Sequence, residues 1–182
     1  TGSVLSLQSA GGEVASVTLS STDIAAGKVT LTTSDLGLDG TKAITARLSD
    51  AAGNLSSGGS GVTVQLDRTA PTAPVLTLNT VSDSGVKGDG LTSVATPSVR
   101  VTFTASEVTA AGAVVRLLDG SGAVVGSKVL SAGEASAGVV DIATSSLGAD
   151  GAKSLTAAVI DAAGNMSAAS TALALTLDTA AP

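Results

Sequence analysis

The 182-residue chain contains no cysteine and no histidine. Disulfides are therefore excluded, and so are the usual zinc, copper, haem and iron–sulfur sites, because these depend on thiolate or imidazole ligands. A thiol nucleophile and an imidazole base are excluded as well, which makes an enzyme the least expected class. A chain without cysteine also fits an extracellular protein that needs no oxidative folding.

Aromatic side chains are nearly absent, since Phe103 is the only one. Platforms for sugars and nucleic-acid bases normally need aromatic rings, so such ligands are not expected here. The formal net charge is −6 and no basic patch could neutralise phosphates, which excludes nucleic acid as a partner. The longest uncharged apolar-rich run, residues 166–177, is too short to cross a bilayer, so we expect no membrane insertion.

What the chain does contain is an internal repeat. Residues 2–71 align with residues 113–182 at a constant offset of 111 residues and without a gap. The string Asp-Ala-Ala-Gly-Asn, for example, occurs at residues 50–54 and again at residues 161–165. A fixed period of this length predicts tandem copies of one small domain, and such copies are typical of proteins selected for length and presentation.

The repeat divides the chain into two parts. Residues 72–182 form one complete unit, whereas residues 1–71 form only the C-terminal part of another, without its first two strands. The connector, residues 67–74, contains two prolines and no glycine, which predicts an extended and stiff segment. The chain is therefore expected to be cut from a longer array; the missing strands are either trimmed away or supplied by another chain.

Apolar residues alternate with polar ones at a period of two, and Asp-Gly and other glycine turns separate the runs. Seven strands are predicted in the complete unit, at residues 75–79, 98–105, 113–118, 124–130, 139–143, 154–160 and 171–177. No segment favours a helix. The pattern predicts an all-β fold of tandem immunoglobulin-like or fibronectin-like β-sandwiches with seven strands in each complete unit.

Four segments resemble bacterial Ig-like repeats of biofilm-associated proteins and giant type I-secreted adhesins: the strand end at residues 66–67, and residues 69–74, 82–92 and 161–165. The resemblance implies a structural stalk on a bacterial cell surface or a secreted protein, stiffened by calcium where domains meet. It implies neighbouring repeats of the same chain as partners, and contact with a host or matrix surface through other domains. The first unit departs from this family, because its N-terminal strands and their acidic loop are missing.

The acidic side chains are the only candidates for chemistry, and the strand order predicts two groups of them. Several carboxylates brought together repel one another unless a cation neutralises them, and calcium accepts six to eight oxygen ligands from irregular loops. We therefore predict calcium as the cofactor. The predicted junction group comprises Asp39, Asp67, Asp161, Asn165 and Glu107, the group at the far end of the second unit comprises Asp83, Asp89, Asp150 and Asp178, and Asp50 is a further candidate.

Other interpretations stay open at this stage. Each aspartate could instead shape its own turn by accepting backbone amides, as Asp and Asn commonly do. Two other functions are alternatives to a calcium-stiffened spacer. One is a filament or surface-layer subunit assembled by strand complementation, and the other is an Ig-like module that binds a ligand itself.

Overall fold

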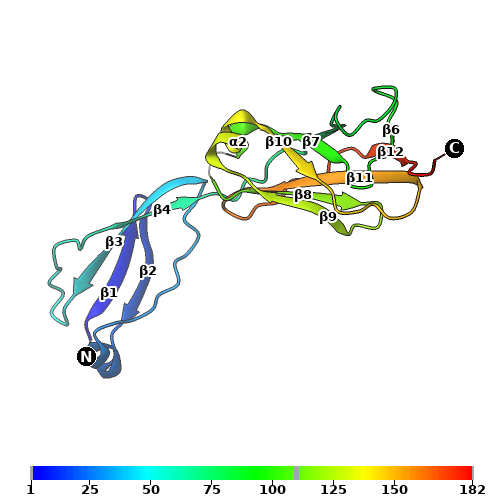
Figure 1. Ribbon diagram of the computed structural model, residues 1–182. Helices are drawn as coiled ribbons and strands as arrows, with labels where there is room; N and C mark the ends of the chain where they lie inside the picture. The colour runs from blue at the N-terminus through cyan, green and yellow to red at the C-terminus, as the bar shows by residue number, and fades with distance from the viewer. Residues whose placement is uncertain (1, 109–110, 182) are drawn as a thin grey trace. The chain divides into compact units, whose positions relative to one another are not determined.

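The computed structural model describes residues 2–108 and 111–181, so Pro182, the last residue of the predicted second unit, lies outside it. The chain divides into two compact units, Thr1–Arg68 and Thr69–Pro182, and the division falls within the predicted connector. Strands dominate both units (Figure 1), which confirms the predicted all-β class.

The second unit is a sandwich of two sheets. One sheet has the strand order β10-β7-β5, and the other has the order β6-β12-β11-β8-β9. Its strands are β5 (Val75–Leu78), β6 (Leu91–Thr92), β7 (Ser98–Thr102), β8 (Val114–Asp119), β9 (Val124–Val129), β10 (Val139–Ala143), β11 (Gly151–Ile160) and β12 (Leu173–Leu177). All seven predicted strands are present, but the prediction of seven is wrong by one. The additional β6 has only two residues and pairs in parallel with β12, so it is too short to give an alternating pattern.

The core of the second unit lies between its two sheets. Val99 and Val101 of β7 face Val115 and Leu117 of β8, and all four side chains are fully buried. Phe103, the single aromatic residue, belongs to the same cluster. Burial of each such aliphatic side chain stabilises the fold by about 1.5–3 kcal/mol, so valine and leucine can build most of this core with only one aromatic ring.

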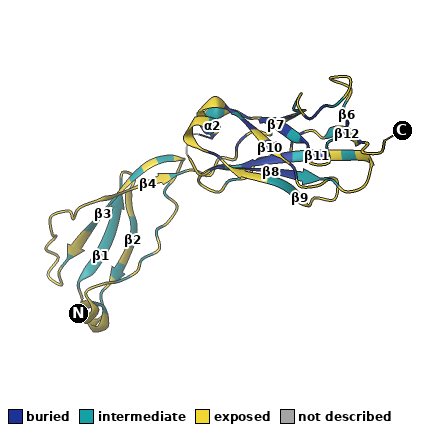
Figure 2. Cartoon of the chain, viewed as in Figure 1, coloured by how far each residue is buried: buried dark blue, intermediate teal, exposed yellow. Residues whose placement is uncertain are grey.

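The first unit is a single sheet. Its strands are β1 (Val4–Ser9), β2 (Gly12–Thr18), β3 (Gly40–Ser49) and β4 (Val62–Leu66), in the order β2-β1-β3-β4. This order corresponds to β9-β8-β11-β12 of the second unit. None of the residues from 2 to 68 is buried, in contrast to the dark-blue strands of the second unit in Figure 2.

Strand pairing shows that the alignment of the two copies contains a gap. Leu7 of β1 lies opposite Ala46, and Leu117 of β8 lies opposite Ala157. The alanines are 111 residues apart, but the leucines are 110 apart. The hairpin turn explains the difference, because it is one residue shorter in the first unit than in the second. The gap-free alignment is therefore wrong for residues 2–9.

Short helices are present, although the sequence analysis expected none. Both α-helices follow the last strand of a hairpin: α1 (Ser21–Ala26) follows β2, and α2 (Ala132–Ala137) follows β9. Each begins with a capping box and ends at a left-handed glycine. A 3-10 turn, η1 (Ala105–Glu107), follows β7. Within the described residues, none of these helices has the length and apolar character needed to span a bilayer.

Candidate functional site

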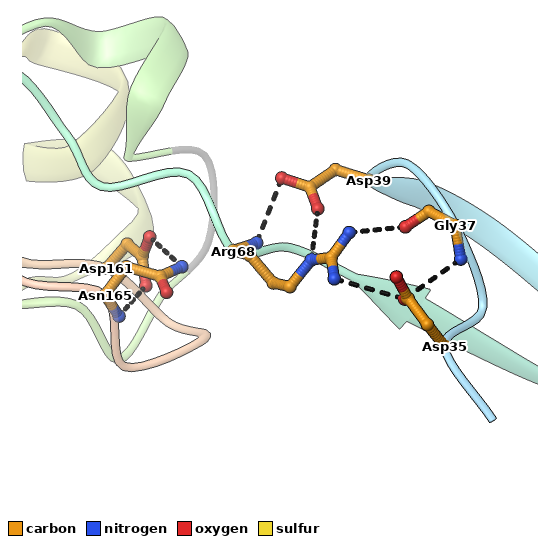
Figure 3. Close-up of polar contacts among 6 residues, drawn as sticks. All are labelled: Asp35, Gly37, Asp39, Arg68, Asp161 and Asn165. Atoms are coloured by element: carbon orange, nitrogen blue, oxygen red, sulfur yellow. Dashed lines mark hydrogen bonds and ion pairs between the residues drawn. The ribbon is translucent and has the colours of Figure 1, made fainter. Parts of the chain in front are cut away.

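Arg68 ties the start of the connector to the first unit (Figure 3). Its backbone N–H donates to Asp39 Oδ2 over 3.0 Å, and its Nε donates to Asp39 Oδ1 over 3.3 Å. The rest of the guanidinium reaches the Asp35 carboxylate at 3.2 Å and the carbonyl of Gly37. Arg68, two positions after the end of β4, is therefore joined to the loop that precedes β3 by four hydrogen bonds.

These contacts are partly exposed to solvent, with side-chain exposures of 52% for Arg68 and 71% for Asp35. Ion pairs of this kind contribute about 0–1 kcal/mol each, because water screens them and long side chains lose entropy. Their main effect is therefore geometric. The planar guanidinium engages two carboxylates and a carbonyl at once, which fixes the direction in which the chain leaves β4.

Glu107 ties the other end of the connector to the second unit. Its Oε2 accepts hydrogen bonds from the backbone N–H of Thr72 at 2.8 Å and from the Thr72 hydroxyl at 2.7 Å. The same hydroxyl lies 3.0 Å from the Thr104 hydroxyl. The two hydrogen bonds from Thr72 hold the pKa of Glu107 below its ordinary value. Only residues 69–71 lie between the anchor at Arg68 and the anchor at Thr72.

Asp161 and Asp50 each close a turn after the long strand of their unit. Asp161 Oδ1 accepts the backbone N–H groups of Ala163 and Asn165, both at 2.9 Å, and its Oδ2 accepts the Asn165 side-chain amide at 3.0 Å (Figure 3). Asp50 repeats this arrangement with Ala52 and Asn54, and the hydrogen bonds from Asn54 lower the pKa of Asp50. In both copies each carboxylate oxygen is engaged by its own turn.

The far end of the second unit collects the remaining candidates, as the strand order predicts. Gly151 pairs with Leu177, which brings Asp150 and Asp178 to the same end of the sheet. The backbone N–H of Asp178 donates to the carbonyl of Thr92 at 2.9 Å, next to the loop between β5 and β6. Residues 150, 178 and the β5–β6 loop therefore share one end of the unit.

The carboxylates at this end have separate local partners. Asp150 accepts the Thr179 hydroxyl at 2.8 Å, which lowers the pKa of Asp150. Thr179 occupies the same repeat position as Arg68, so in both copies the side chain after the strand-end aspartate contacts the loop aspartate. Asp178 accepts the backbone N–H of Ala180 at 3.2 Å, and Asp89 accepts the backbone N–H of Leu91 at 2.9 Å.

Asp83 and Asp161 are both buried, with 4% and 6% of their surface exposed, but Asp83 is not fully satisfied by its own turn. The Oδ2 of Asp83 accepts the backbone N–H of Gly88, but its buried Oδ1 has no hydrogen-bond partner among residues 2–108 and 111–181. A buried polar atom without a partner destabilises the folded state, and more so when it is ionised. Asp83 and Asp89 both line a cavity of about 360 Å³ between the β5–β6 loop and β12.

Across residues 2–108 and 111–181, acidic side chains form no group of three or more that could hold a metal ion. A cation bound by Asp83 and Asp89 would therefore take its remaining ligands from main-chain oxygens or water, both of which calcium accepts. The predicted junction group of Asp39, Asp67, Asp161, Asn165 and Glu107 stays a prediction.

The sequence analysis missed the residues that anchor the connector: Arg68, Thr72 and, at the second copy's end, Thr179. Their partners lie 29 to 35 positions away in the sequence, so no local motif contains both members of a pair. One signal was available. Arg68 is the only cationic residue of the connector, and it directly follows Asp67.

The profile of a family described as "Bacterial Ig-like domain" matches residues 69–179. None of the curated proteins compared with the sequence matches it.

Several solved structures are similar to the chain. One, titled "Biofilm associated protein - BSP domain", is 18% identical with a TM-score of 0.39; the alignment covers 98% of this chain and 25% of that one. A tetra-tandem repeat from the extending region of a large adhesion protein is 21% identical with a TM-score of 0.45, over 97% and 42% of the two chains. Fibronectin(III)-like modules of Clostridium thermocellum CbhA are 11% identical with a TM-score of 0.48, over 96% and 77%. This chain thus spans about a quarter of the first of these structures.

Proposed function

Because the chain belongs to the bacterial Ig-like domain family, we propose that its units are structural repeats, joined by a stiff connector, that hold other parts of a longer protein at a distance. The observation that carries this proposal is the anchoring of the connector on both sides. Arg68 binds the first unit, Thr72 binds the second, and only residues 69–71 lie between them.

Connector length and composition explain why this anchoring matters. Eight unrestrained residues of a Gly/Ser-rich tether have a root-mean-square span of about 15 Å. Two anchors and a proline at position 71 remove most of that freedom, since proline fixes φ and each anchor fixes the chain direction. A connector of this kind would be stiffer than such a tether, which is the property that a spacer needs.

The finer parts of the proposal concern location and partners. We place these repeats in the stalk of an extracellular bacterial adhesin, either secreted or attached to the cell surface, as in biofilm-associated proteins. The partners would be neighbouring repeats of the same chain, and contact with a host or matrix surface would fall to other domains. The acidic, aromatic-poor composition supports a solvated spacer over a sugar-binding module.

We also propose that calcium binds the second unit at the β5–β6 loop and stiffens it. Asp83 and Asp89 would provide carboxylate ligands, and the unpartnered Asp83 Oδ1 is the observation that supports a cation there. Bound calcium would neutralise the buried carboxylate and link residues 83 and 89 across the loop.

The connector proposal can be tested by ¹⁵N relaxation of amide groups in the whole chain. If the connector is stiff, both units tumble together and report one rotational correlation time, that of the entire particle. Two shorter and different correlation times would show that the units reorient independently, and the spacer proposal would then lose its physical basis.

The calcium proposal can be tested by thermal unfolding of the whole chain in millimolar calcium and in chelator. We expect calcium to raise the melting temperature of the second unit by several degrees, because a ligand at 100 times its Kd stabilises by about 2.7 kcal/mol. Asp83→Asn and Asp89→Asn should remove the increase. Asp119→Asn is the matched control, since Asp119 closes a hairpin turn elsewhere in the unit. An identical melting temperature with calcium and with chelator would rule calcium out.

A further inference from the structure

Lys87 is the only cationic residue of the loop between β5 and β6, which also contains Asp83 and Asp89. Its ammonium group donates a hydrogen bond to the main-chain carbonyl of Asp83. In the part of the chain that the structure describes, Lys87 forms no ion pair with either carboxylate, and Asp83 Oδ1 has no partner. The positive charge of the loop therefore lies beside a backbone oxygen of Asp83, while one of its carboxylate oxygens stays unsatisfied.

Asp83 is held in place by the strands on either side of the loop. Its backbone N–H donates to the carbonyl of Asn79 at 3.1 Å. The preceding residue, Ser82, accepts the backbone N–H of Ser98 at its hydroxyl over 2.8 Å, and its carbonyl accepts the Thr92 hydroxyl over 2.5 Å. Ser82 and Thr92 are both buried. The fold, and not the lysine, thus sets the position of the unsatisfied oxygen.

Lys87 lies on the exposed side of the same loop. Residues 85–89 are all exposed, and Val86 exposes 72% of its surface. The lysine ammonium group is strongly hydrated and sits on a flexible stem, so it can leave the Asp83 carbonyl for water without disturbing the core. The contact can therefore open when another cation takes the place of the lysine.

Calcium and the ammonium group would compete for one small region of the loop. Calcium binds main-chain carbonyl oxygens as well as carboxylates, and the carbonyl and carboxylate of Asp83 belong to a single residue. A calcium ion at Asp83 Oδ1 would therefore lie close to the ammonium group. Two cations at such short range repel each other, and more strongly where water is excluded. Binding of calcium thus requires that the ammonium group leave.

We propose that Lys87 sets the calcium affinity of this loop by acting as a tethered competitor. Its ammonium group binds the Asp83 carbonyl when calcium is absent and returns to solvent when calcium occupies the site. This inference rests on the calcium site proposed above and concerns its regulation. A cation then stands next to Asp83 with or without calcium, and the site fills only at a higher calcium concentration than Asp83 and Asp89 alone would require.

The charge of the loop indicates how large the effect should be. Asp83 and Asp89 contribute −2 and Lys87 contributes +1, so residues 79–90 carry a formal charge of −1. Lys87→Met keeps the length of the side chain and changes this charge to −2. Removing one positive charge beside a divalent cation should tighten calcium binding by about tenfold, even at a water-like dielectric constant.

The test is calcium titration of the full chain by calorimetry. We expect Lys87→Met to lower the Kd by about tenfold, and Lys87→Arg, which keeps the charge, to give a much smaller change. Asp83→Asn should abolish calcium binding in the Lys87→Met chain, which places the gain at the same site. Lys28→Met is the matched control, because Lys28 is exposed in the first unit and its loss changes the net charge equally.

A second measurement needs no calcium. In chelator, Lys87→Met should lower the melting temperature of the second unit by about 1–4 °C, because the cation beside Asp83 is then missing. In saturating calcium the order should reverse, since the ion replaces the lysine and meets no competitor. Lys28→Met should leave the melting temperature of the second unit unchanged in both conditions.

The outcomes separate this inference from the calcium proposal itself. Equal calcium affinity in Lys87→Met and in the unchanged chain would overturn the inference and leave the calcium site intact. An equal gain in Lys28→Met would also overturn it, since the effect would then come from net charge. A higher melting temperature of Lys87→Met in chelator would contradict a stabilising role of the lysine. If neither the unchanged chain nor Lys87→Met binds calcium, both proposals fail.

Discussion

Leu7 and Leu117 occupy the same position in two copies of one sheet, each directly opposite an alanine of the neighbouring long strand. Leu117 is fully buried, whereas Leu7 remains partly exposed. The surrounding strands are alike in both copies. The difference arises because β5, β7 and β10 cover Leu117, and residues 2–68 contain no such second sheet.

This difference predicts unequal costs for the same substitution. Leu117→Ala should destabilise the second unit by about 2–5 kcal/mol, because it removes buried apolar contacts and leaves a cavity. Leu7→Ala should cost under about 1 kcal/mol in the first unit, since water already reaches that side chain. Chemical denaturation of the full chain, followed at amides of each unit, measures both. Equal costs would contradict the single-sheet description of the first unit.

Gly138 is the residue for which glycine is most strictly required. Its φ is +66°, and a Cβ placed there would lie 2.8 Å from the carbonyl oxygen of Phe103. Gly138→Ala should therefore destabilise the second unit by more than about 2 kcal/mol, which combines left-handed strain of about 1–2 kcal/mol with the clash. Gly148→Ala is the control, with φ +81° and nothing within 4 Å of its Cβ. Thermal unfolding that ranks the two variants equally would show that Phe103 can move away.

Arg68 should stiffen the connector through its guanidinium. Arg68→Ala keeps only the backbone contact to Asp39, so we expect larger motion between the units and a stability change of under about 1 kcal/mol. Arg68→Lys should give an intermediate result, because an ammonium group cannot engage Asp35, Asp39 and Gly37 in one plane. Amide relaxation detects the motion. Arg47→Ala, at an exposed position of β3, is the control, and an equal effect from it would exclude a specific role for Arg68.

Glu134 gives a prediction for acid stability. The neighbouring Lys128 ammonium, with further hydrogen bonds from Ser131, lowers the pKa of Glu134 to about 2. A carboxylate whose folded-state pKa is depressed stabilises the fold above its unfolded-state pKa, and this contribution is lost as pH falls toward 2. The melting temperature should therefore fall less between pH 4.5 and pH 2 in Glu134→Gln than in the unchanged chain.

Glutamine at position 134 can still cap α2, so this comparison isolates the charge. The carboxyl ¹³C shift of Glu134 provides a direct check of its titration. A midpoint near the ordinary value for glutamate would remove the basis for this prediction.

Much of the fold could be predicted because its strands have clear local signals. The alternation of apolar and polar residues around Val99, Val101 and Phe103 predicted β7, and glycine-containing turns predicted where strands end. The helices were missed although Ser131 and Glu134 form a recognisable capping box, because six residues are too few for a helical period. The one-residue gap between the copies was hidden by chance matches and became visible only through the partners of Leu7 and Leu117.

The features that could not be predicted depend on pairing between residues that are distant in the sequence. Residues 28–32 carry the strand pattern of β10 but form no strand, since a strand needs hydrogen-bond partners and β7 has no counterpart in the first unit. The same dependence on distant partners explains why part of the candidate site could not be predicted. The sequence analysis included a self-closed turn as one interpretation of Asp161. It could not foresee the contacts of Arg68 and Glu107, because their partners lie 29 and 35 residues away in the sequence.

The central proposal, a stiff connector between the repeats, is tested most directly by a distance distribution between spin labels. Because the chain lacks cysteine, Ser16→Cys and Ser127→Cys place one label on an exposed strand position of each unit without competing sites. The account predicts a single narrow distribution, which broadens when residues 68–72 are replaced by glycine and serine. A distribution already as broad in the unchanged chain as in the glycine–serine variant would contradict it.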